Sequence, residues 1–253
     1  MKFRLAVPAV ISLILAVLML AACDGKPSTQ SSVNPYASGR VATFSRTSGT
    51  AASTPEPTVD LGPGILLQDD FSDPKSGWEV SSSDYGLVEY ENGRYKVESY
   101  VEDTYNWCVA GIHAADVRMD VDVEVAATVE NGNDAFGVDC RVQENGDGYG
   151  FRISSDGYIG ISKYVETKGI ELQEWITSDA VYVDGRTNHL TAICQGDHLQ
   201  FLVNDVMVAE VTDDSFASGD IGFSALTFEP GTITVFFDNI IVQEVGTPYL
   251  YGE

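Results

Sequence analysis

Short stretches in which apolar and polar residues alternate recur from about residue 65 to residue 245. They include RYKVESYV (94–101), MDVDVEV (119–125), AFGVDCRV (135–142), YGFRIS (149–154) and HLQFLVN (198–204). A period of two residues predicts strands with one buried face. No window keeps a helical period over the ten or so residues that a helix needs. The pattern therefore predicts an all-β fold.

Turn dipeptides separate these stretches at short intervals. They are Asn92-Gly93, Asn131-Gly132, Asn145-Gly146, Asp156-Gly157, Asp184-Gly185 and Gly196-Asp197. Such pairs favour the tight turns that join antiparallel strands. About a dozen strands without a crossover helix predict two antiparallel sheets packed face to face, as in a jelly roll.

The amino-terminal residues have the pattern of a secretory signal. Lys2 and Arg4 precede an apolar run from Leu5 to Leu20, so residues 1–22 are interpreted as a signal peptide. The run ends in LAAC, which resembles the lipobox of bacterial lipoproteins and implies that Cys23 carries lipid. The alternative is a transmembrane anchor, but the run is shorter than the roughly 20 residues that a bilayer needs. The resemblance places the protein in a bacterial cell envelope, lipid-anchored and facing outside the cytoplasm.

Residues 23–64 are rich in Ser, Thr, Pro, Ala and Gly and contain few large apolar residues. Such a composition cannot offset the entropy of ordering a chain, so a flexible linker is expected there. A single domain is expected over residues 65–245, which are enough for a proper core. Residues 246–253 are expected to form a tail.

Several longer segments occur in an order that resembles the concanavalin A-like lectin/glucanase superfamily. They are DDFSDPKSGW (69–78), YGFRIS running into SSDGYIGI (149–161), NHLTAICQGDHLQFLVND (188–205), SGDIGF (218–223) and FFDNIIV (236–242). The likeness is greatest to lipoprotein domains of the laminin-G-like and 3-keto-disaccharide hydrolase-like kind. It covers residues 65–245 and implies a jelly-roll sandwich. It implies no single activity, because sugar binders, glycosidases and structural modules share this fold.

Three cysteines remain once Cys23 is assigned to lipid. Cys140 and Cys194 each end an alternating run and share a face with apolar neighbours. In an oxidising compartment this predicts a disulfide between two strands. Cys108 is then a buried thiol that behaves as a small hydrophobe. The alternative is three buried thiols, since sequence does not fix connectivity.

The chain has 38 Asp and Glu against 14 Lys and Arg, a net charge of −24 that lies almost entirely in residues 65–245. Such a surface repels phosphate backbones, so nucleic acid is excluded as an expected partner. It attracts calcium ions or neutral polar ligands. The alternative explanation is solubility or adaptation to salt.

Three acidic residues alternate with valines in the segment 119–125; Asp120, Asp122 and Glu124 are called the acidic comb below. The comb is similar to that of family-16 glycosidases, which implies Asp120 as nucleophile, Asp122 as helper and Glu124 as acid. Asp120 departs from that pattern by one methylene. The ends of the comb are about 13 Å apart along a strand that rises about 3.3 Å per residue. Retaining glycosidases hold their carboxyl groups about 5 to 5.5 Å apart.

Two alternatives explain the comb without catalysis. In one, Arg118, Arg141 and Arg152 occupy polar alternation positions and form cross-strand ion pairs with it. In the other, the comb is part of a binding face. Sugars stack on flat aromatic rings while charged groups fix their hydroxyls. The residues predicted to bind a ligand are Asp122, Glu124, Arg141, Arg152, Tyr149, Tyr158 and Trp175, and further available rings are Tyr105, Trp107 and Tyr164.

Carboxylates near the ends of the domain suggest a structural calcium ion. Asp69, Asp70 and Asp73 flank the first strand and Asp238 lies in the last long one. Terminal strands of jelly rolls often pair, and calcium takes six to eight oxygen ligands. The alternative is a group of separately solvated side chains.

The sequence contains no GxSxG elbow, P-loop, HExxH or dinucleotide fingerprint. We therefore expect a membrane-tethered lipoprotein whose domain binds a glycan or another extracellular ligand without turning it over. The alternatives are a glycoside hydrolase that uses the comb, and a structural module that contacts an envelope protein.

Overall fold

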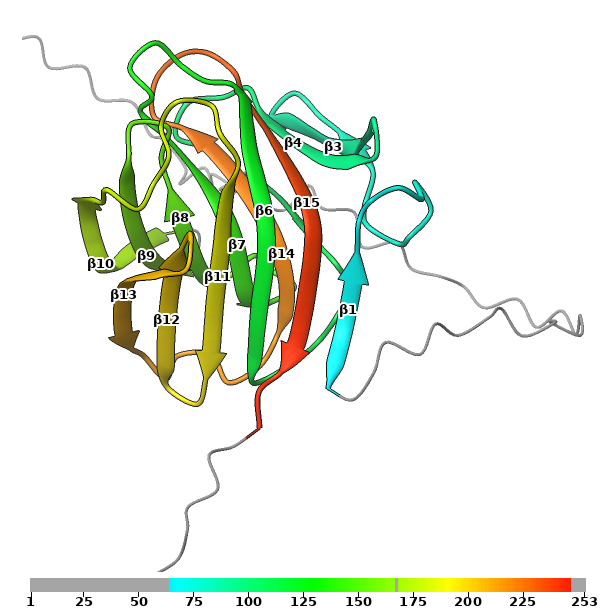
Figure 1. The fold of residues 1–253 in the computed structure, drawn as a ribbon, viewed down its shortest axis with the longest axis vertical. Helices are drawn as coiled ribbons and strands as arrows, with labels where there is room; N and C mark the ends of the chain where they lie inside the picture. The colour runs from blue at the N-terminus through cyan, green and yellow to red at the C-terminus, as the bar shows by residue number, and fades with distance from the viewer. Residues whose placement is uncertain (1–63, 167, 247–253) are drawn as a thin grey trace, which may run out of the picture. The chain divides into compact units, whose positions relative to one another are not determined.

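The protein is described from a computed structural model that covers residues 64–166 and 168–246 (Figure 1). The signal peptide, the lipidation at Cys23 and nearly all of the linker and tail lie outside the described residues. Within the described part there are fifteen strands, β1 to β15. No helix there is long and apolar enough to cross a membrane.

The strands form two antiparallel sheets. Nine of them form one sheet in the order β13 (Val206–Thr212), β12 (His198–Val203), β11 (Asn188–Gln195), β6 (Val117–Ala127), β15 (Ile233–Glu244), β4 (Arg94–Ser99), β3 (Gly86–Glu91) and β2 (Ser81–Ser82), with β1 (Ile65–Asp69) also paired to β15. The second sheet has the order β10 (Lys168–Thr177), β9 (Tyr158–Val165), β8 (Gly148–Ile153), β7 (Asp134–Val142), β14 (Asp220–Thr227) and β5 (Asn106–Val109). This arrangement confirms the predicted all-β jelly-roll sandwich.

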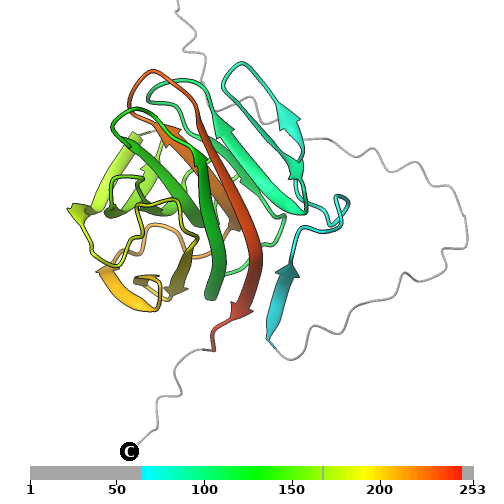
Figure 2. The same cartoon turned by 45° about the horizontal axis from the view of Figure 1, so that its top comes forward.

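The nine-stranded sheet lies in front in Figure 1, and the six-stranded sheet lies behind it. Figure 2 shows β1 alongside the carboxyl end of β15, where Asp69 pairs with Ile240. The first and last strands of the described part are therefore neighbours, as expected for a jelly roll.

Tight turns at predicted dipeptides join successive strands. Asn92 and Gly93, which link β3 to β4, have φ angles of 55° and 76°. Both angles lie in the left-handed region, which asparagine and glycine tolerate better than other residues and which matches the twist of a hairpin. Three further dipeptides, Asn145-Gly146, Asp156-Gly157 and Gly196-Asp197, join β7 to β8, β8 to β9 and β11 to β12.

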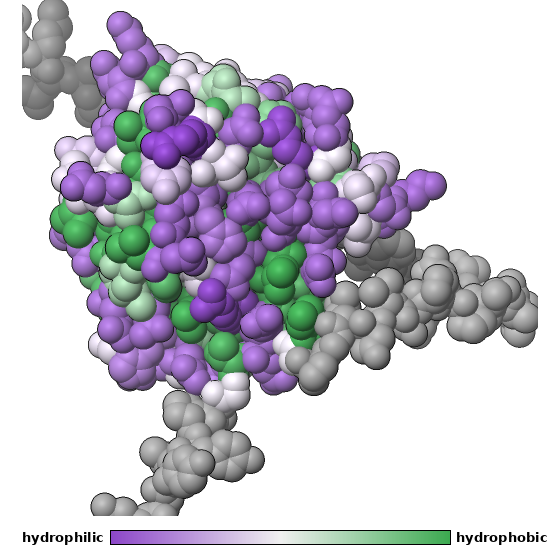
Figure 3. Space-filling model, in the orientation of Figure 1, coloured by the Kyte–Doolittle hydropathy of each residue, from purple (hydrophilic) through white to green (hydrophobic). Residues whose placement is uncertain are grey.

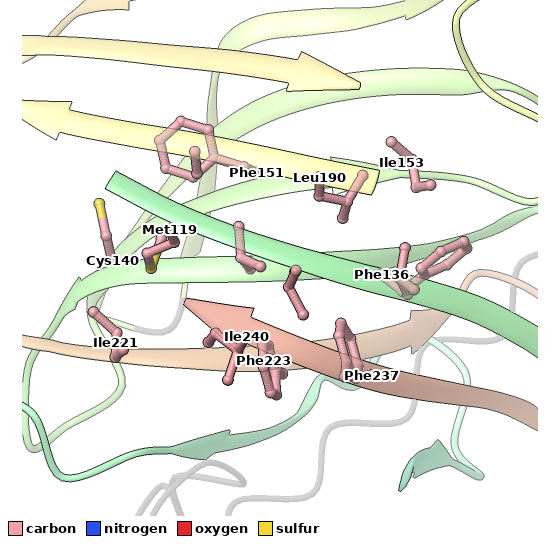
Figure 4. Packing of buried hydrophobic residues seen from close by; sticks show 14 of the residues in the cluster. Met119, Phe136, Cys140, Phe151, Ile153, Leu190, Ile221, Phe223, Phe237 and Ile240 are labelled. Atoms are coloured by element: carbon pink, nitrogen blue, oxygen red, sulfur yellow. The ribbon is translucent and has the colours of Figure 1, made fainter. Parts of the chain in front are cut away.

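The core lies between the sheets and contains the apolar side of each alternating run (Figure 4). On β6, Val121 and Val123 are buried, as the period of two predicts. Phe223 of β14 stacks on Phe237 of β15 with ring centroids 4.1 Å apart, so aromatic rings from both sheets meet. Trp78 stacks on the other side of Phe223 at 4.6 Å and is buried, as expected from the sequence.

A disulfide joins the two sheets. Cys140 of β7 is bonded to Cys194 of β11, with Cα atoms 7.0 Å apart and a separation of 54 residues along the chain. The predicted pairing is confirmed. Cys108 is free and buried, and burial raises the pKa of its thiol to about 12. It is therefore a neutral thiol packed as an apolar side chain.

Candidate functional site

The outer face of the six-stranded sheet carries a buried arginine at its centre. Phe151 of β8 contacts Phe201 of the opposite sheet, with ring centroids 5.7 Å apart, so it points inward. Because side chains alternate along a strand, Gly148, Gly150 and Arg152 point outward. We call this outer surface the pocket face.

Small residues surround Arg152 and leave room for its side chain. In the sheet its direct neighbours are Gly160 of β9 and Gly137 of β7. Its guanidinium lies over Gly150, where a Cβ atom would stand 2.6 Å from Nη2. Trp175 of β10 packs against Gly160 in the same way, at 3.2 Å from a Cβ built there. These glycines therefore form the floor on which the larger side chains lie.

An ion pair holds the guanidinium in place. Nη1 of Arg152 donates a hydrogen bond to the carbonyl oxygen of Val138 at 2.8 Å, and Nη2 pairs with Oδ1 of Asp139. Burial by itself lowers the pKa of Arg152, but the charge of Asp139 outweighs burial and the net pKa is raised. The arginine is thus charged at any physiological pH.

Three buried polar atoms at this place have no hydrogen-bond partner in the described part of the chain. They are Oδ2 of Asp139, Nε of Arg152 and Oγ of Ser224. All three residues line a single cavity. Such atoms are rare in native proteins, and each costs about 1 to 3 kcal/mol when it stays unpaired. Their convergence points to a site that a polar ligand, or water in its absence, completes.

Aromatic rings wall the cavity. Tyr105 meets Tyr164 edge to face with ring centroids 5.0 Å apart, and its ring centroid is 5.4 Å from Cζ of Arg152. Burial raises the pKa of both tyrosines, so both hydroxyls stay protonated. Trp107 forms another wall and lies under Gly146, at the tip of the β7–β8 hairpin. The cavity measures about 40 Å³.

The acidic comb lies on the other outer face of the sandwich. Because Val121 and Val123 point into the core, Asp120, Asp122 and Glu124 point away from it, on the outside of the nine-stranded sheet. We call this surface the comb face. Figure 3 shows it as largely hydrophilic.

Each carboxylate of the comb has a polar partner. Arg118 holds Asp120 through two hydrogen bonds of 2.7 Å, and Thr191 donates a third at 2.7 Å. Asp122 lies 2.8 Å from Nδ1 of His189 and accepts a hydrogen bond from Asn239. Glu124 pairs with Arg94 at 3.1 Å. The acidic comb therefore forms a series of ion pairs and hydrogen bonds along the outer side of the nine-stranded sheet.

The expected cross-strand partners Arg141 and Arg152 are wrong, and Arg118 does pair with the comb but with Asp120 of its own strand, β6. Arg141 and Arg152 belong to the other sheet, on β7 and β8, and both are buried. Alternation shows that a residue faces away from the core but not which sheet carries it. The remaining partners of the comb are Arg94 of β4, His189 and Thr191 of β11, and Asn239 of β15, which lies where the pairing of β15 with β6 shifts register.

A hollow of about 150 Å³ lies beside part of the comb, lined by Asp122, Glu124 and Asp238 among others. Burial raises the pKa of Asp238, and the charges of Asp122 and Asp70 raise it further. This hollow gathers negative charge, and the nearest guanidinium, from Arg94, is bonded to Glu124.

The residues predicted to bind a ligand are thus divided among three places. Arg152, Tyr158 and Trp175 lie on the pocket face, whereas Asp122 and Glu124 lie on the comb face. Arg141 and Tyr149 lie in the interior, and Tyr149 also contributes to the lining of the cavity.

The two interior residues have structural contacts of their own. Arg141 donates hydrogen bonds to three backbone carbonyls and pairs with Asp116. Tyr149 donates from its hydroxyl to Asp213 and accepts from the backbone of Phe216. Both side chains fasten loops at one end of the sandwich.

The carboxylates predicted to bind calcium accept hydrogen bonds from residues one or two positions further along the chain. Asp69 accepts a hydrogen bond from the backbone of Phe71, Asp70 accepts two from Ser72, and Asp238 accepts one from Asn239. Within the described ranges no group of three or more acidic, histidine or cysteine side chains is arranged to hold a metal. A calcium ion at this place stays a prediction.

Comparison with known proteins identifies the fold. No family model matches the chain, and no curated protein matches it. Among solved structures, "carbohydrate binding module CBM66 from Bacillus subtilis" aligns with a TM-score of 0.54 and 16% identity, covering 66% of this chain and 96% of that one. A protein of unknown function with a galectin-like fold from Bacillus subtilis gives 0.54 and 10% identity, covering 73% and 97%.

A prokaryotic β-1,3-1,4-glucanase (lichenase) from a mouse hindgut metagenome gives a TM-score of 0.55 and 10% identity, covering 71% of this chain and 99% of that one. At such identities the likeness shows the jelly-roll fold alone. The site must be argued from the residues themselves.

Proposed function

We propose that this protein is a membrane-tethered extracytoplasmic lipoprotein that binds carbohydrate at the pocket face without catalysing a reaction. The observation that carries the proposal is that three residues with a buried, unpartnered polar atom, Asp139, Arg152 and Ser224, all line one aromatic-walled cavity. Sugar hydroxyls both donate and accept hydrogen bonds, and the C–H faces of sugars stack on aromatic rings. A sugar therefore satisfies both features at once.

The solved structures support a carbohydrate ligand by analogy. They include a carbohydrate-binding module and glucanases, which share this sandwich architecture. The lipid anchor rests on the LAAC motif and Cys23, and the residues that follow supply a tether. Together these features favour a domain held near a membrane that captures glycans outside the cytoplasm.

The absence of catalysis rests on the state of the carboxylates in the pocket. Asp139 is held by a charged guanidinium, and Asp147 accepts hydrogen bonds from Asn145 and the backbone of Glu166. A glycosidase needs one carboxyl group that delivers a proton and a second that attacks or activates water. Both carboxylates that line the cavity are therefore held by other groups of the protein.

A glycan array followed by titration calorimetry tests the proposal. The full-length protein is expected to bind at least one class of glycan and to release it unchanged. Ser224→Ala removes one of the three free polar atoms, and we expect it to weaken binding about tenfold, the worth of one hydrogen bond of about 1 to 1.5 kcal/mol.

The matched control is Thr191→Val, which deletes a buried hydroxyl on the comb face. Its affinity for the same glycan should equal that of the wild type. Binding that survives Ser224→Ala unchanged but is lost in Thr191→Val would move the site to the comb face. Binding of no glycan at all would refute the proposal.

A further inference from the structure

The lining of the cavity on the pocket face combines one guanidinium with two carboxylates. We infer that the cavity around Arg152 selects neutral sugars, which it holds by two adjacent hydroxyl groups, and rejects acidic sugars. This inference rests on the proposed function and adds the class of ligand to it.

The first step is the hydrogen-bonding capacity that remains in the cavity. Of the five N–H donors of Arg152, Nη1 uses two on the carbonyl oxygens of Val138 and Phe151 and Nη2 uses one on Asp139, which leaves Nε–H and the second hydrogen of Nη2. Asp139 contributes one free acceptor, Oδ2, and the hydroxyl of Ser224 can donate or accept. A hydroxyl that donates to Oδ2 of Asp139 and a neighbouring hydroxyl that accepts from Nε–H of Arg152 satisfy one unpaired atom of each partner. A carboxylate, which only accepts, leaves Oδ2 of Asp139 unpaired.

The second step is the charge of the lining. Two carboxylates, Asp139 and Asp147, and one guanidinium, Arg152, line the cavity, which leaves an excess of negative charge. The arginine is therefore not available as a counter-ion for an anionic ligand. The chain as a whole adds a net charge of −24. A carboxylated or sulfated sugar must give up its hydration to enter a site that already repels it.

The third step is size. A cavity of about 40 Å³ has room for about three water molecules, since each needs about 10 to 15 Å³ on this measure. This space accepts one edge of a single sugar ring, with its two hydroxyls. The rest of the ring lies against the aromatic wall, which Tyr105, Tyr164 and Trp107 form.

Matched pairs of sugars test the inference. Methyl glucoside is compared with methyl glucuronide, and methyl galactoside with methyl galacturonide, by titration calorimetry on the full-length protein. In any pair that binds, we expect the acidic member to bind at least tenfold more weakly. Equal or tighter binding of the acidic member overturns the inference while leaving carbohydrate binding in place. If array and titration find no sugar that binds, the proposed function itself fails.

The variant Asp139→Asn provides a gain-of-function test. It keeps the shape of the side chain and removes the charge that neutralises Arg152, so the charge of the lining changes from negative to neutral, with Asp147 and Arg152 remaining. We expect the ratio of neutral to acidic affinity to fall at least tenfold. Asp122→Asn makes the same change on the comb face and should leave the ratio as it is in the wild type. A ratio that is unchanged in Asp139→Asn overturns the inference.

Salt dependence decides the matter if Asp139→Asn does not fold. In the wild type, raising sodium chloride from about 0.05 M to about 0.5 M should lower the ratio of neutral-sugar affinity to acidic-sugar affinity, because screening weakens the repulsion of the acidic sugar. The affinity for the neutral sugar should stay constant over the same range. A neutral-sugar affinity that falls steeply with salt shows a charge-driven contact and overturns the inference.

Discussion

The two outer faces of the sandwich handle charge in opposite ways. On the comb face, Asp120, Asp122 and Glu124 are partly solvated, and each is bonded to other polar side chains of the same sheet. On the pocket face one ion pair, Arg152 with Asp139, is buried and still leaves polar atoms of both partners unpaired. The comb face has the more conspicuous row of acids. Among the described residues, three of the four buried side-chain atoms without a partner belong to the pocket face, and the fourth is Oδ2 of Asp69 on β1.

The difference has a thermodynamic reason. Exposed ion pairs typically contribute about 0 to 1 kcal/mol, so the comb face gains little from its ladder and loses little without it. A buried pair carries a large desolvation cost that only good geometry repays. A protein that keeps such a pair with unsatisfied atoms beside an aromatic-walled cavity accepts lower stability there, as binding sites commonly do.

The largest expected effect compares the two arginines. Arg152→Gln leaves Asp139 as an uncompensated buried charge, which costs about 3 to 5 kcal/mol of unfolding free energy. Arg118→Gln breaks a part-buried pair on the comb face in which Thr191 still donates to Asp120, and the expected loss is below about 1 kcal/mol. Urea unfolding followed by circular dichroism measures both. Equal losses would show that the two faces do not differ as described.

The second effect concerns the bond that joins the sheets. Replacing both Cys140 and Cys194 by alanine should lower the unfolding free energy by about 2 to 4 kcal/mol, because the unfolded chain is no longer constrained. Glycan binding by the protein that remains folded should persist, since neither sulfur lies on an outer face. A double variant as stable as the wild type would contradict a formed disulfide.

The third effect has opposite signs on the two faces. Ser224→Ala removes a buried hydroxyl that has no partner, so stability should stay the same or rise by up to about 1 kcal/mol. Thr191→Val removes a hydroxyl bonded to Asp120 and should lower stability by about 1 kcal/mol. Thermal melts of the unliganded proteins give both signs. Destabilisation by Ser224→Ala would indicate that its hydroxyl is already satisfied.

The smallest effect is a pH dependence on the comb face. Burial raises the pKa of Asp120, but hydrogen bonds from Arg118 and Thr191 outweigh burial, and the net pKa lies below its usual value. A lowered pKa stabilises the folded state above the unfolded-state pKa, and this contribution is lost as the pH falls through the folded-state value. Wild type and Asp120→Asn should therefore differ by less than about 1 kcal/mol at pH 7 and converge below about pH 4. A gap that widens in acid would contradict the assignment.

Much of the fold follows from local pattern. The valines of β6 and the hairpin at Asn92-Gly93 were predictable because burial on one face and a left-handed turn each leave a signature within a few residues. The pairing of Cys140 with Cys194 was predictable because each shares a face with apolar neighbours. These features need no knowledge of which strand lies beside which.

The site required that knowledge. Arg141 and Arg152 both occupy polar positions in the sequence, yet one fastens loops and the other lies at the centre of the pocket face. Asp139 and Ser224 were not predicted, because each is an isolated polar residue in an otherwise buried strand. The sequence did contain one signal for the site. Gly148, Gly150 and Arg152 are spaced two residues apart, so they share one face of a strand, and the two glycines leave that face open for the arginine side chain.

A structure of the full-length protein bound to the glycan chosen on the array tests the central claim most directly. The account predicts a sugar ring in the cavity of the pocket face, with hydroxyls within hydrogen-bonding distance of Asp139, Arg152 and Ser224. A sugar seated over Asp122 and Glu124 on the comb face, with the Arg152 cavity filled only by water, would contradict it.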